Sequence, residues 1–531
     1  MTDLLTAPPE TVAAGAAPPP WRVAAAVARV EGPRLLRSPL VLVGFALNLA
    51  MTFGGPWVSN LRTDSADSGF VFLLGAAGTL IASNLATLRG RRHGTEELFG
   101  ADPAPPGART GGHLLAVAWP TALAVALLPV TVGAAVVLRD AFGRPDLADL
   151  AVGPLLVAGA GALGVLLARW APSALAGPVA CVGIAALELY LTSPAVLDDG
   201  LRWMAFWQGA GDIDLLPPRP SGWHVVYLVG LVAMAWVGAL LRHGWRRPLV
   251  VAGATALAVV AGSTRMQAGT VTDEAWAARN RLLADPVATQ VCQDGEAARY
   301  CYYPGYGPLV DRWSVVVEGV RRRVPEAAWP GATEVRQKFA TQVYSPYDEL
   351  HPVLPALPPW DAPDPDDGRL RPGTGWTTDG TADLSLGLAV ASRAVGLPVV
   401  APAPSAVCDA SGQGRAVVAL WLAARSTPDA AGALRKLAEA PPAVGGGVVV
   451  VPAEAVQAAV GWGREDLGYA LALLERPADE VQAALARDWA QLTDPATTST
   501  GVADTLGLSP AAVGRPADDL PPDVRVEGRC P

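Results

Sequence analysis

Residues 113–138 read HLLAVAWPTALAVALLPVTVGAAVVL, an apolar run that contains no acid, lysine or arginine. A helix that crosses a bilayer needs about 20 mostly apolar residues, so this run is long enough to span. Six further runs have a similar character, the last of them being short: 39–55, 69–88, 150–168, 177–197, 222–241 and 249–263. The sequence therefore predicts a polytopic α-helical membrane domain of six or seven spans over residues 39–263.

The segment before the first run differs from the runs themselves. Residues 21–38 read WRVAAAVARVEGPRLLRS and place Trp21, Val27 and Leu35 at roughly helical spacing among arginines. This pattern favours a helix that lies in the membrane interface, although a loop helix would share it. Residues 1–20 are predicted to be a disordered tail, and because they lack an apolar core we expect no signal-peptide cleavage.

The composition changes after about residue 262. Up to that point the chain has 17 arginines and 16 acids, and the remainder carries 23 basic and 33 acidic residues, a net charge of −10. Neither part is basic, which argues against nucleic acid as a partner. We predict that residues 264–531 form a soluble α+β domain, called the C-terminal domain below.

Arginine and cysteine placement together predict the orientation. If the N-terminus is cytoplasmic, twelve of the 17 N-terminal arginines fall on the inner side, as the positive-inside rule requires. With seven spans the C-terminal domain is then extracytoplasmic, where disulfides persist. We expect Cys292 and Cys301 to pair across a hairpin, and Cys408 to pair most simply with Cys530. The predicted location is the cell (plasma) membrane, as a multi-pass protein.

A charged island, RGRRHGTEELFGADPAPPGARTGG at residues 89–112, interrupts the apolar runs on the predicted cytoplasmic side. We expect a short helix over residues 95–99, because Thr95 is a good N-cap and acids suit the first helical turn. The alternative is a solvated loop whose arginines only anchor the topology. If the island docks to a partner protein, the residues expected to contact that partner are Arg91, Arg92, Thr95, Glu96, Glu97 and Phe99.

A second unusual segment, DDGLRWMAFWQGAGDIDLLPPRPSG at residues 198–222, lies on the opposite side. Its aromatic residues Trp203, Phe206 and Trp207 suit the depth of a membrane interface.

An interfacial helix, two spans, the charged island and this aromatic segment together resemble the permeases of the type-2 ABC exporter family, over about residues 20–245. The resemblance implies that the island couples the spans to a separate ABC ATPase subunit, and that short helices within residues 198–222 dip into the outer leaflet. It also implies a homodimer or a second permease subunit within the lipid bilayer. The chain has no G-x-x-x-x-G-K-[ST] motif, so ATP and Mg are expected in the partner and no cofactor in this chain. A seventh span and the C-terminal domain depart from the family pattern.

Polar residues inside the apolar runs are candidates for function. Glu188, in AALELYL, is the one acid well within a run, and intramembrane ionisable groups often mark a pathway or proton relay. It also lies near the outer end of its run, where it could reach the interface. Asn48 and Asn84 more often join helices than bind cargo.

The C-terminal domain shows helical periodicity at residues 273–285, 310–324, 383–396, 415–426, 429–439, 453–461, 463–475 and 477–491. Its layout is similar to zinc-metallopeptidase-like (gluzincin, peptidase MA-like) domains that follow some ABC permease halves. That chemistry needs H-E-x-x-H, and His351 is the sole histidine after residue 264. We therefore expect neither a catalytic nor a metal site, and no enzymatic activity in this chain.

Two functions follow from these patterns. The first is a permease subunit driven by a separate ATPase, with the C-terminal domain as a cap or binding module. The second is a membrane-anchored extracytoplasmic sensor or scaffold without transport activity. Glycine-rich runs such as VAGAGALGVLL favour close, movable helix packing and hence the permease.

Overall fold

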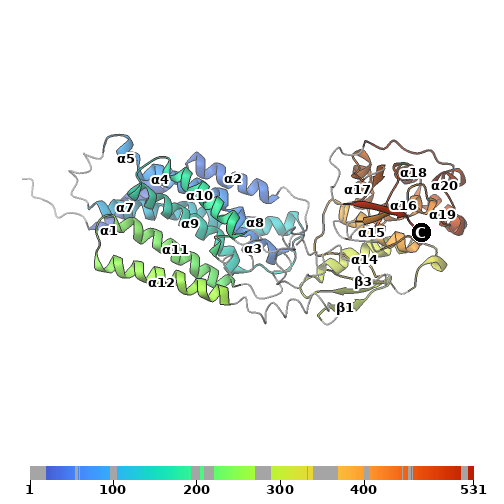
Figure 1. Cartoon of the computed structure of the whole chain (residues 1–531), viewed down its shortest axis with the longest axis horizontal. Helices are drawn as coiled ribbons and strands as arrows, with labels where there is room; N and C mark the ends of the chain where they lie inside the picture. The colour runs from blue at the N-terminus through green and yellow to red at the C-terminus, as the bar shows by residue number, and fades with distance from the viewer. Residues whose placement is uncertain are drawn as a thin grey trace, which may run out of the picture.

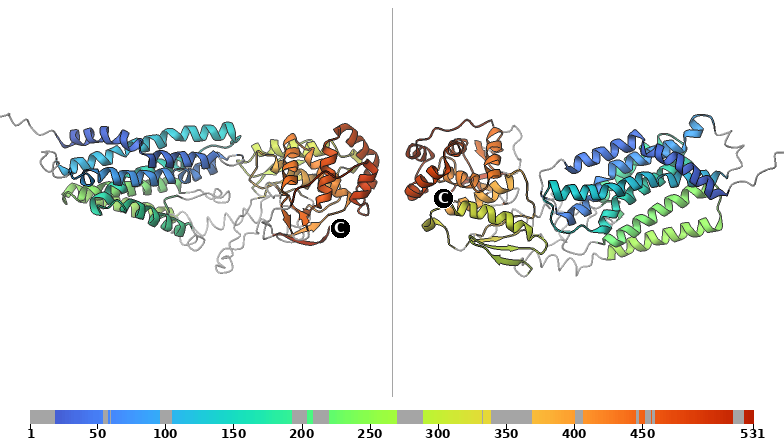
Figure 2. Two further views of the ribbon diagram at one scale, coloured as in Figure 1. Left: turned by 90° about the horizontal axis from the view of Figure 1, so that it is seen from above. Right: turned by 180° about the vertical axis from the view of Figure 1, so that it is seen from behind.

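The computed structural model describes residues 19–53, 58, 60–95, 105–192, 204–207, 220–269, 289–331, 333–338, 369–399, 406–444, 447–451, 456, 459–515 and 524–531. They form two parts that follow one another along the long axis of the molecule (Figure 1). The first is a helical bundle of residues 20–269, and the second is the C-terminal domain from residue 289 onward. In the other views the bundle helices still run roughly along this axis, with the C-terminal domain at one end (Figure 2).

The bundle consists of long helices and one short helix. Their bounds are α1 (Pro20–Leu36), α2 (Pro39–Phe53), α3 (Leu61–Val71), α4 (Leu73–Thr87), α5 (Arg89–Arg92), α7 (Pro106–Ala116), α8 (Ala118–Leu138), α9 (Leu147–Trp170), α10 (Ala176–Leu191), α11 (Ser221–Leu241) and α12 (Arg247–Gly269).

Among the described residues, five helical stretches are long and apolar enough to cross a membrane: Leu61–Thr87, Pro106–Leu138, Leu147–Trp170, Ser221–Leu241 and Arg247–Gly269. Helices α1 and α2 add a sixth if the pair, bent by 51°, counts as one span. Helix α10 is apolar but has only 16 residues. Each of the seven predicted runs thus contributes a helix, and the short run 249–263 belongs to the longer helix α12.

Residues 61–68, a polar stretch between the predicted runs 39–55 and 69–88, form most of helix α3. Asn60 caps this helix by accepting a hydrogen bond from the backbone N–H of Arg62 at 3.1 Å. The hydroxyl of Ser68 donates to the carbonyl of Asp149 in α9 at 2.9 Å. Since polar contacts rather than an apolar stripe hold α3 in place, hydrophobic periodicity did not indicate it.

Glycines let three helices of the bundle approach closely. A Cβ atom at Gly78 of α4 would collide with the carbonyl of Leu40 in α2. One at Gly164 of α9 would collide with the carbonyl of Leu80 in α4. The glycine-rich runs therefore pack α2, α4 and α9 backbone against backbone, as their composition predicts.

The C-terminal domain combines helices with short strands. Its elements are β1 (Val291–Asp294), β2 (Arg299–Tyr302), α14 (Pro308–Arg321), the 3-10 turn η5 (Glu326–Ala328), β3 (Glu334–Arg336), α15 (Thr381–Ala394), β4 (Ala406–Asp409), α16 (Gly414–Ala424), α17 (Pro428–Glu439), β5 (Ala443–Val444), β6 (Val448–Val449), β7 (Val460–Gly461), α18 (Arg464–Leu474), α19 (Ala478–Leu492), α20 (Ser499–Leu506) and β8 (Arg525–Arg529).

Three small sheets hold these strands. In the first, β2 pairs antiparallel with β1 and parallel with β3. In the second, β4 lies between β7 and β8 and runs parallel to both. Strands β5 and β6 form an antiparallel pair. The domain is thus a mixed α and β unit with a lower share of strand than of helix.

Helix α16 is the centre of this domain, since every one of its residues is buried. Trp421 of α16 and Trp313 of α14 are fully covered and belong to one continuous core. The predicted helices at 310–324, 383–396, 415–426, 429–439, 463–475 and 477–491 all form within a few residues of their expected bounds. The helix predicted over 453–461 is wrong at its end, because Val460 and Gly461 pair with β4 as strand β7.

Candidate functional site

Helix α5 and the start of α7, which flank the predicted coupling loop, lie at the end of the bundle that points away from the C-terminal domain, called the inner end (Figure 1). Arg91 and Arg92 are exposed in α5. Both the backbone N–H and the hydroxyl of Thr95 bond to the carbonyl of Gly90, at 2.9 and 3.1 Å. The other residues of the helix predicted over 95–99 lie outside the described residues: Glu96, Glu97 and Phe99.

A largely buried carboxylate ties α1 to this loop. Arg89, the first residue of α5, places Nη1 2.8 Å from both carboxylate oxygens of Glu31. Arg34 of α1 also contacts Glu31, at 3.0 Å. Sequence reasoning missed this pair because 58 residues separate its members, although a lone acid in an arginine-rich helix was a usable signal.

A second link joins α7 to the connection between α11 and α12. The hydroxyl of Thr110 lies 2.7 Å from Nε2 of His243. Burial lowers the pKa of His243, and the nearby Arg169 and Arg242 lower it further. A neutral imidazole is therefore favoured at this position. The Glu31–Arg89 pair thus connects α1 to α5, and this second link connects α7 to His243.

The two asparagines within predicted apolar runs bond to backbone, as expected of residues that join helices. Asn48 of α2 accepts from the N–H of Gly75 at 2.8 Å and donates to the carbonyl of Phe70 at 3.3 Å. It thereby bridges the break between α3 and α4. Asn84 of α4 bonds to the backbone of α9 or of the turn after it in either orientation of its amide.

Glu188 and two of the predicted aromatic residues meet in one arrangement. The carboxylate of Glu188 accepts the backbone N–H groups of Phe206 and Trp207, at 3.0 and 2.7 Å. The ring of Trp207 packs against that of Phe70 in α3, with centroids 5.1 Å apart. Glu188 therefore anchors the turn at residues 204–207 to α10. Trp203 lies outside the described residues.

Three further buried side chains hold the same turn. Tyr227 of α11 donates to the carbonyl of Met204 at 2.9 Å. His224 places its ring nitrogens 3.2 Å from the carbonyl of Phe206 and 2.9 Å from Oε1 of Gln267 in α12. Sequence reasoning missed His224, Tyr227 and Gln267, which lie at the ends of apolar runs. The turn is thus fastened to α10 and α11, and through His224 to α12.

The C-terminal domain contacts loops at the end of the bundle opposite the inner end. The N–H of Val58 donates to the carbonyl of Trp376 at 2.8 Å. Arg312 of α14 forms an ion pair with Asp140 at 3.0 Å. The ring of Phe142 meets that of Tyr306, with centroids 6.0 Å apart. These contacts engage the chain just before α3 and just after α8.

A cavity of about 240 Å³ lies between α2, α3, α8 and α9, next to these loops. We call it the α3 cavity, because residues 61–71 supply half of its lining. Its wall mixes apolar side chains with hydroxyls and with three charged residues, Asp64, Asp67 and Arg139. This cavity was not predicted, since Asp64 and Asp67 lie between two predicted apolar runs, in a stretch to which no element was assigned.

Both predicted disulfides form in the C-terminal domain. Cys292 and Cys301 are paired across the β1–β2 hairpin, where they also face each other in the strand register. Cys408 of β4 joins Cys530, which follows β8. The remaining cysteine, Cys181 of α10, is free.

Helix α16 is wholly buried and contains no His, Cys, Asp or Glu. Arg415 at its start bonds to Gln413 and to the carbonyl of Gly396, at 2.8 and 2.7 Å. In the part of the chain that the structure describes, no group of three or more His, Cys, Asp or Glu residues could hold a metal ion. His351 lies outside that part.

One buried carboxylate of this domain has a shifted pKa. Asp466 of α18 accepts hydrogen bonds from the N–H groups of Gly412 and Gly463 and from the hydroxyl of Ser499. Burial raises its pKa to about 6, against the opposing effect of these three hydrogen bonds. Because its oxygens are engaged in joining loops, the group is structural in character.

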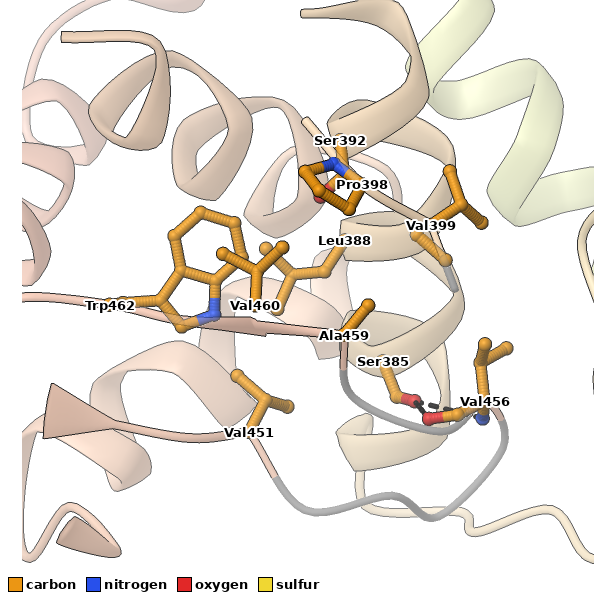
Figure 3. Close-up of a pocket in the computed structure, with 11 residues that line it drawn as sticks. Ser385, Leu388, Ser392, Pro398, Val399, Val451, Val456, Ala459, Val460 and Trp462 are labelled. Atoms are coloured by element: carbon orange, nitrogen blue, oxygen red, sulfur yellow. Dashed lines mark hydrogen bonds between the residues drawn. The ribbon is translucent and has the colours of Figure 1, made fainter. Parts of the chain in front are cut away.

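A small cleft opens between α15 and β7 (Figure 3). Leu388, Val399 and Trp462 give it an apolar wall, and Ser385 bonds to the backbone of Val456 at 3.0 Å at its edge. Its volume of about 30 Å³ is that of roughly one water molecule in the liquid. The cleft is therefore too small for a ligand of ordinary size.

Comparisons with protein-family models, with curated proteins and with solved structures find no match to this chain.

Proposed function

We propose that this chain is the membrane-spanning permease subunit of an ATP-binding cassette transporter, driven by a separate ATPase subunit. The C-terminal domain is proposed to act as an extracytoplasmic cap or binding module. The proposal rests on the resemblance to type-2 ABC exporter permeases in the order of helices and loops. It includes a homodimer or a second permease subunit, because the chain supplies one set of spans.

The surface of the bundle supports a membrane location. Val137 of α8, Val182 of α10 and Leu189 of α10 are 76, 72 and 73% exposed. Apolar side chains this exposed on several helices suit contact with lipid, whereas a soluble domain exposes few such patches. The two disulfides suit an extracytoplasmic C-terminal domain.

The arrangement of the loops supports the proposed sidedness. The inner end carries α5 and the start of α7, which flank the coupling loop, and the C-terminal domain contacts the opposite end (Figure 1). The arginine-rich island and the disulfide-bonded domain are thus at opposite ends of the bundle. This matches a cytoplasmic island and an extracytoplasmic domain.

The observation that carries the proposal is the fastening of the coupling loop to several helices. Glu31 binds Arg89 just before the loop, and Thr110 binds His243 just after it. A force applied to the loop by an ATPase would therefore act on α1, α7 and α11 together. A loop that only anchors topology would need no such links.

The test is co-purification of an ATPase with the full chain from its native host in a gentle detergent. The Phe99→Ala variant should lose at least about 2 kcal/mol of binding, or roughly 30-fold in affinity, because a buried aromatic anchor is removed. Trp245→Ala is the matched control, since Trp245 is an exposed aromatic at the same end of the bundle. If no ATPase accompanies the wild type, the proposed function is wrong.

The alternative is a membrane-anchored sensor or scaffold. It is favoured by the continuous core of the C-terminal domain, which gives that domain the means to bind a partner by itself. In that case partners would be retained through the C-terminal domain, and changes in the coupling loop would leave them bound.

A further inference from the structure

We propose that the α3 cavity binds a small cationic amphiphile: one amine or quaternary ammonium group on an apolar chain. The inference deepens the proposed function, because such a molecule would be the cargo or a regulator of the permease. Binding itself requires no ATPase, so the site can be tested separately from transport.

The size of the cavity suits such a group. Its volume of about 240 Å³ equals that of roughly eight water molecules in the liquid. It falls slightly below the ~300–1,000 Å³ of pockets for drug-sized ligands. A head group with the first part of a chain fits this space, and a bulky polycyclic molecule does not.

The hydroxyls of the cavity wall favour a ligand that donates hydrogen bonds or carries positive charge. Ser65, Ser68 and Thr131 already donate to backbone carbonyls, at 2.5, 2.9 and 2.9 Å. A hydroxyl that has given its proton to one partner offers only acceptor lone pairs to another. Ser65 also accepts the backbone N–H of Asp146 at 3.1 Å and so keeps one lone pair. The lone pairs that remain on the three hydroxyl oxygens can accept a hydrogen bond from a ligand.

The charged groups favour the same kind of ligand. Asp64 and Asp67 are three residues apart on α3 and both line the cavity, with Arg139 at the end of α8. The described lining thus contains two carboxylates and one guanidinium, and each of these three groups also has an interaction within the chain. In a partly buried site of low dielectric, a lining with more carboxylates than guanidinium groups favours a cation over an anion.

The apolar side chains of the lining suit both the apolar chain and the ammonium head group of the proposed ligand. Phe70 and Phe72 line the cavity, and aromatic faces attract organic ammonium groups through cation–π interaction. Met51 and Phe70 are 57 and 40% exposed, so they provide an apolar mouth on the side of the bundle. An amphiphile can thus reach the acids laterally from the bilayer.

The experiment uses the full chain in lipid nanodiscs and a spin-labelled alkyltrimethylammonium probe. We expect a motionally restricted signal that saturates at one probe per chain and that unlabelled dodecyltrimethylammonium displaces. Displacement by tetramethylammonium at equal concentration would overturn the assignment to an amphiphile, since that ion lacks a chain. If a spin-labelled fatty acid were motionally restricted to the same extent as the cationic probe, the proposed preference for positive charge would be wrong.

Variants that are expected to change the affinity for the probe in opposite directions test the charged residues of the cavity. Asp64→Asn combined with Asp67→Asn should weaken probe binding at least tenfold, whereas Arg139→Gln should strengthen it. The matched control is Asp294→Asn, which removes an exposed acid of the C-terminal domain and should change nothing.

These outcomes remain separate from those of the ATPase experiment. If the double variant fails to fold, an unchanged or weaker affinity of Arg139→Gln still contradicts the site. Absence of probe binding in a chain that co-purifies with an ATPase overturns the site alone. Probe binding without any ATPase overturns the proposed transport function alone.

Discussion

The helical bundle and the C-terminal domain use their buried polar groups differently. In the bundle, Asn48 and Glu188 bind backbone groups where helices break or where a turn packs against them. In the C-terminal domain, Arg415 and Asp466 fasten loops around a core that is already closed. The disulfides also belong to the second part.

This difference fits the proposed surroundings of each part, a bilayer for the bundle and water for the C-terminal domain. Inside a bilayer no water satisfies a broken backbone, so a polar side chain must supply the missing partner. In a water-exposed domain the same breaks can face solvent, and cross-links between distant segments become the stronger source of stability. The predictions below test this contrast, from the largest expected effect to the smallest.

The largest effect is expected from the disulfide that closes the longer loop. Cys408 and Cys530 are 122 residues apart, whereas Cys292 and Cys301 are nine apart. By loop-closure entropy, replacing Cys408 and Cys530 by serine should lower the unfolding free energy by about 5 kcal/mol, and replacing Cys292 and Cys301 should lower it by about 3 kcal/mol. Urea unfolding of the full chain, followed by tryptophan fluorescence, measures both. A greater loss from the hairpin pair would contradict the ranking.

A smaller effect, which depends on pH, is expected at Asp466. Its pKa is raised from 3.8 to about 6, so the folded state holds the proton more tightly than the unfolded chain does. The stability from this group is complete below pH 3.8, decreases as pH rises through 6, and is then lower by about 3 kcal/mol.

Asp466→Asn removes this titration while keeping the shape of the side chain. The unfolding free energy of the variant relative to wild type should therefore rise between pH 4 and pH 7. Urea unfolding at the two pH values tests it, and taking the difference cancels the other titrating groups. A difference that does not change with pH would mean that burial of Asp466 is not the dominant cause.

The smallest effect is expected in the bundle. Asn48→Leu leaves the N–H of Gly75 without this partner and should lower stability by about 1 kcal/mol, as is typical of polar contacts between membrane helices. Ser263→Ala is the control, because that buried hydroxyl bonds to the carbonyls of Val259 and Val260 within the continuous helix α12, at 2.6 and 3.0 Å. Thermal unfolding in detergent compares the two. Equal losses would remove the special role of the helix break.

Helices could be predicted well from the sequence where apolar runs are long, and poorly where polar contacts determine whether a helix forms. The run at 113–138 forms helix, but a break at Val117 separates α7 from α8 within continuous apolar sequence. Helix α3 was missed because it depends on its cap and on a contact with α9. Strand β7 was read as helix, since its partner β4 lies about 50 residues earlier in the chain.

The candidate sites were predicted only as separate residues. Glu188, Phe206 and Trp207 each stood out by chemistry, but no sequence pattern shows that the carboxylate binds the two backbone N–H groups. His224 and Gln267 meet across 43 residues, and neither has a local signature. The cysteine pairs were predictable because few combinations of four residues exist.

With the C-terminal domain in its proposed extracytoplasmic location, the separations of the cysteines also impose an order of pairing during N-to-C export. Cys292 and Cys301 leave the translocation channel almost together and can bond at once in their hairpin. Cys408 then emerges when both earlier thiols are already consumed, and it stays unpaired until Cys530 follows 122 residues later. Early formation of the Cys292–Cys301 disulfide would thus prevent mispairing, because Cys408 and Cys530 then meet no competing thiol within the same domain.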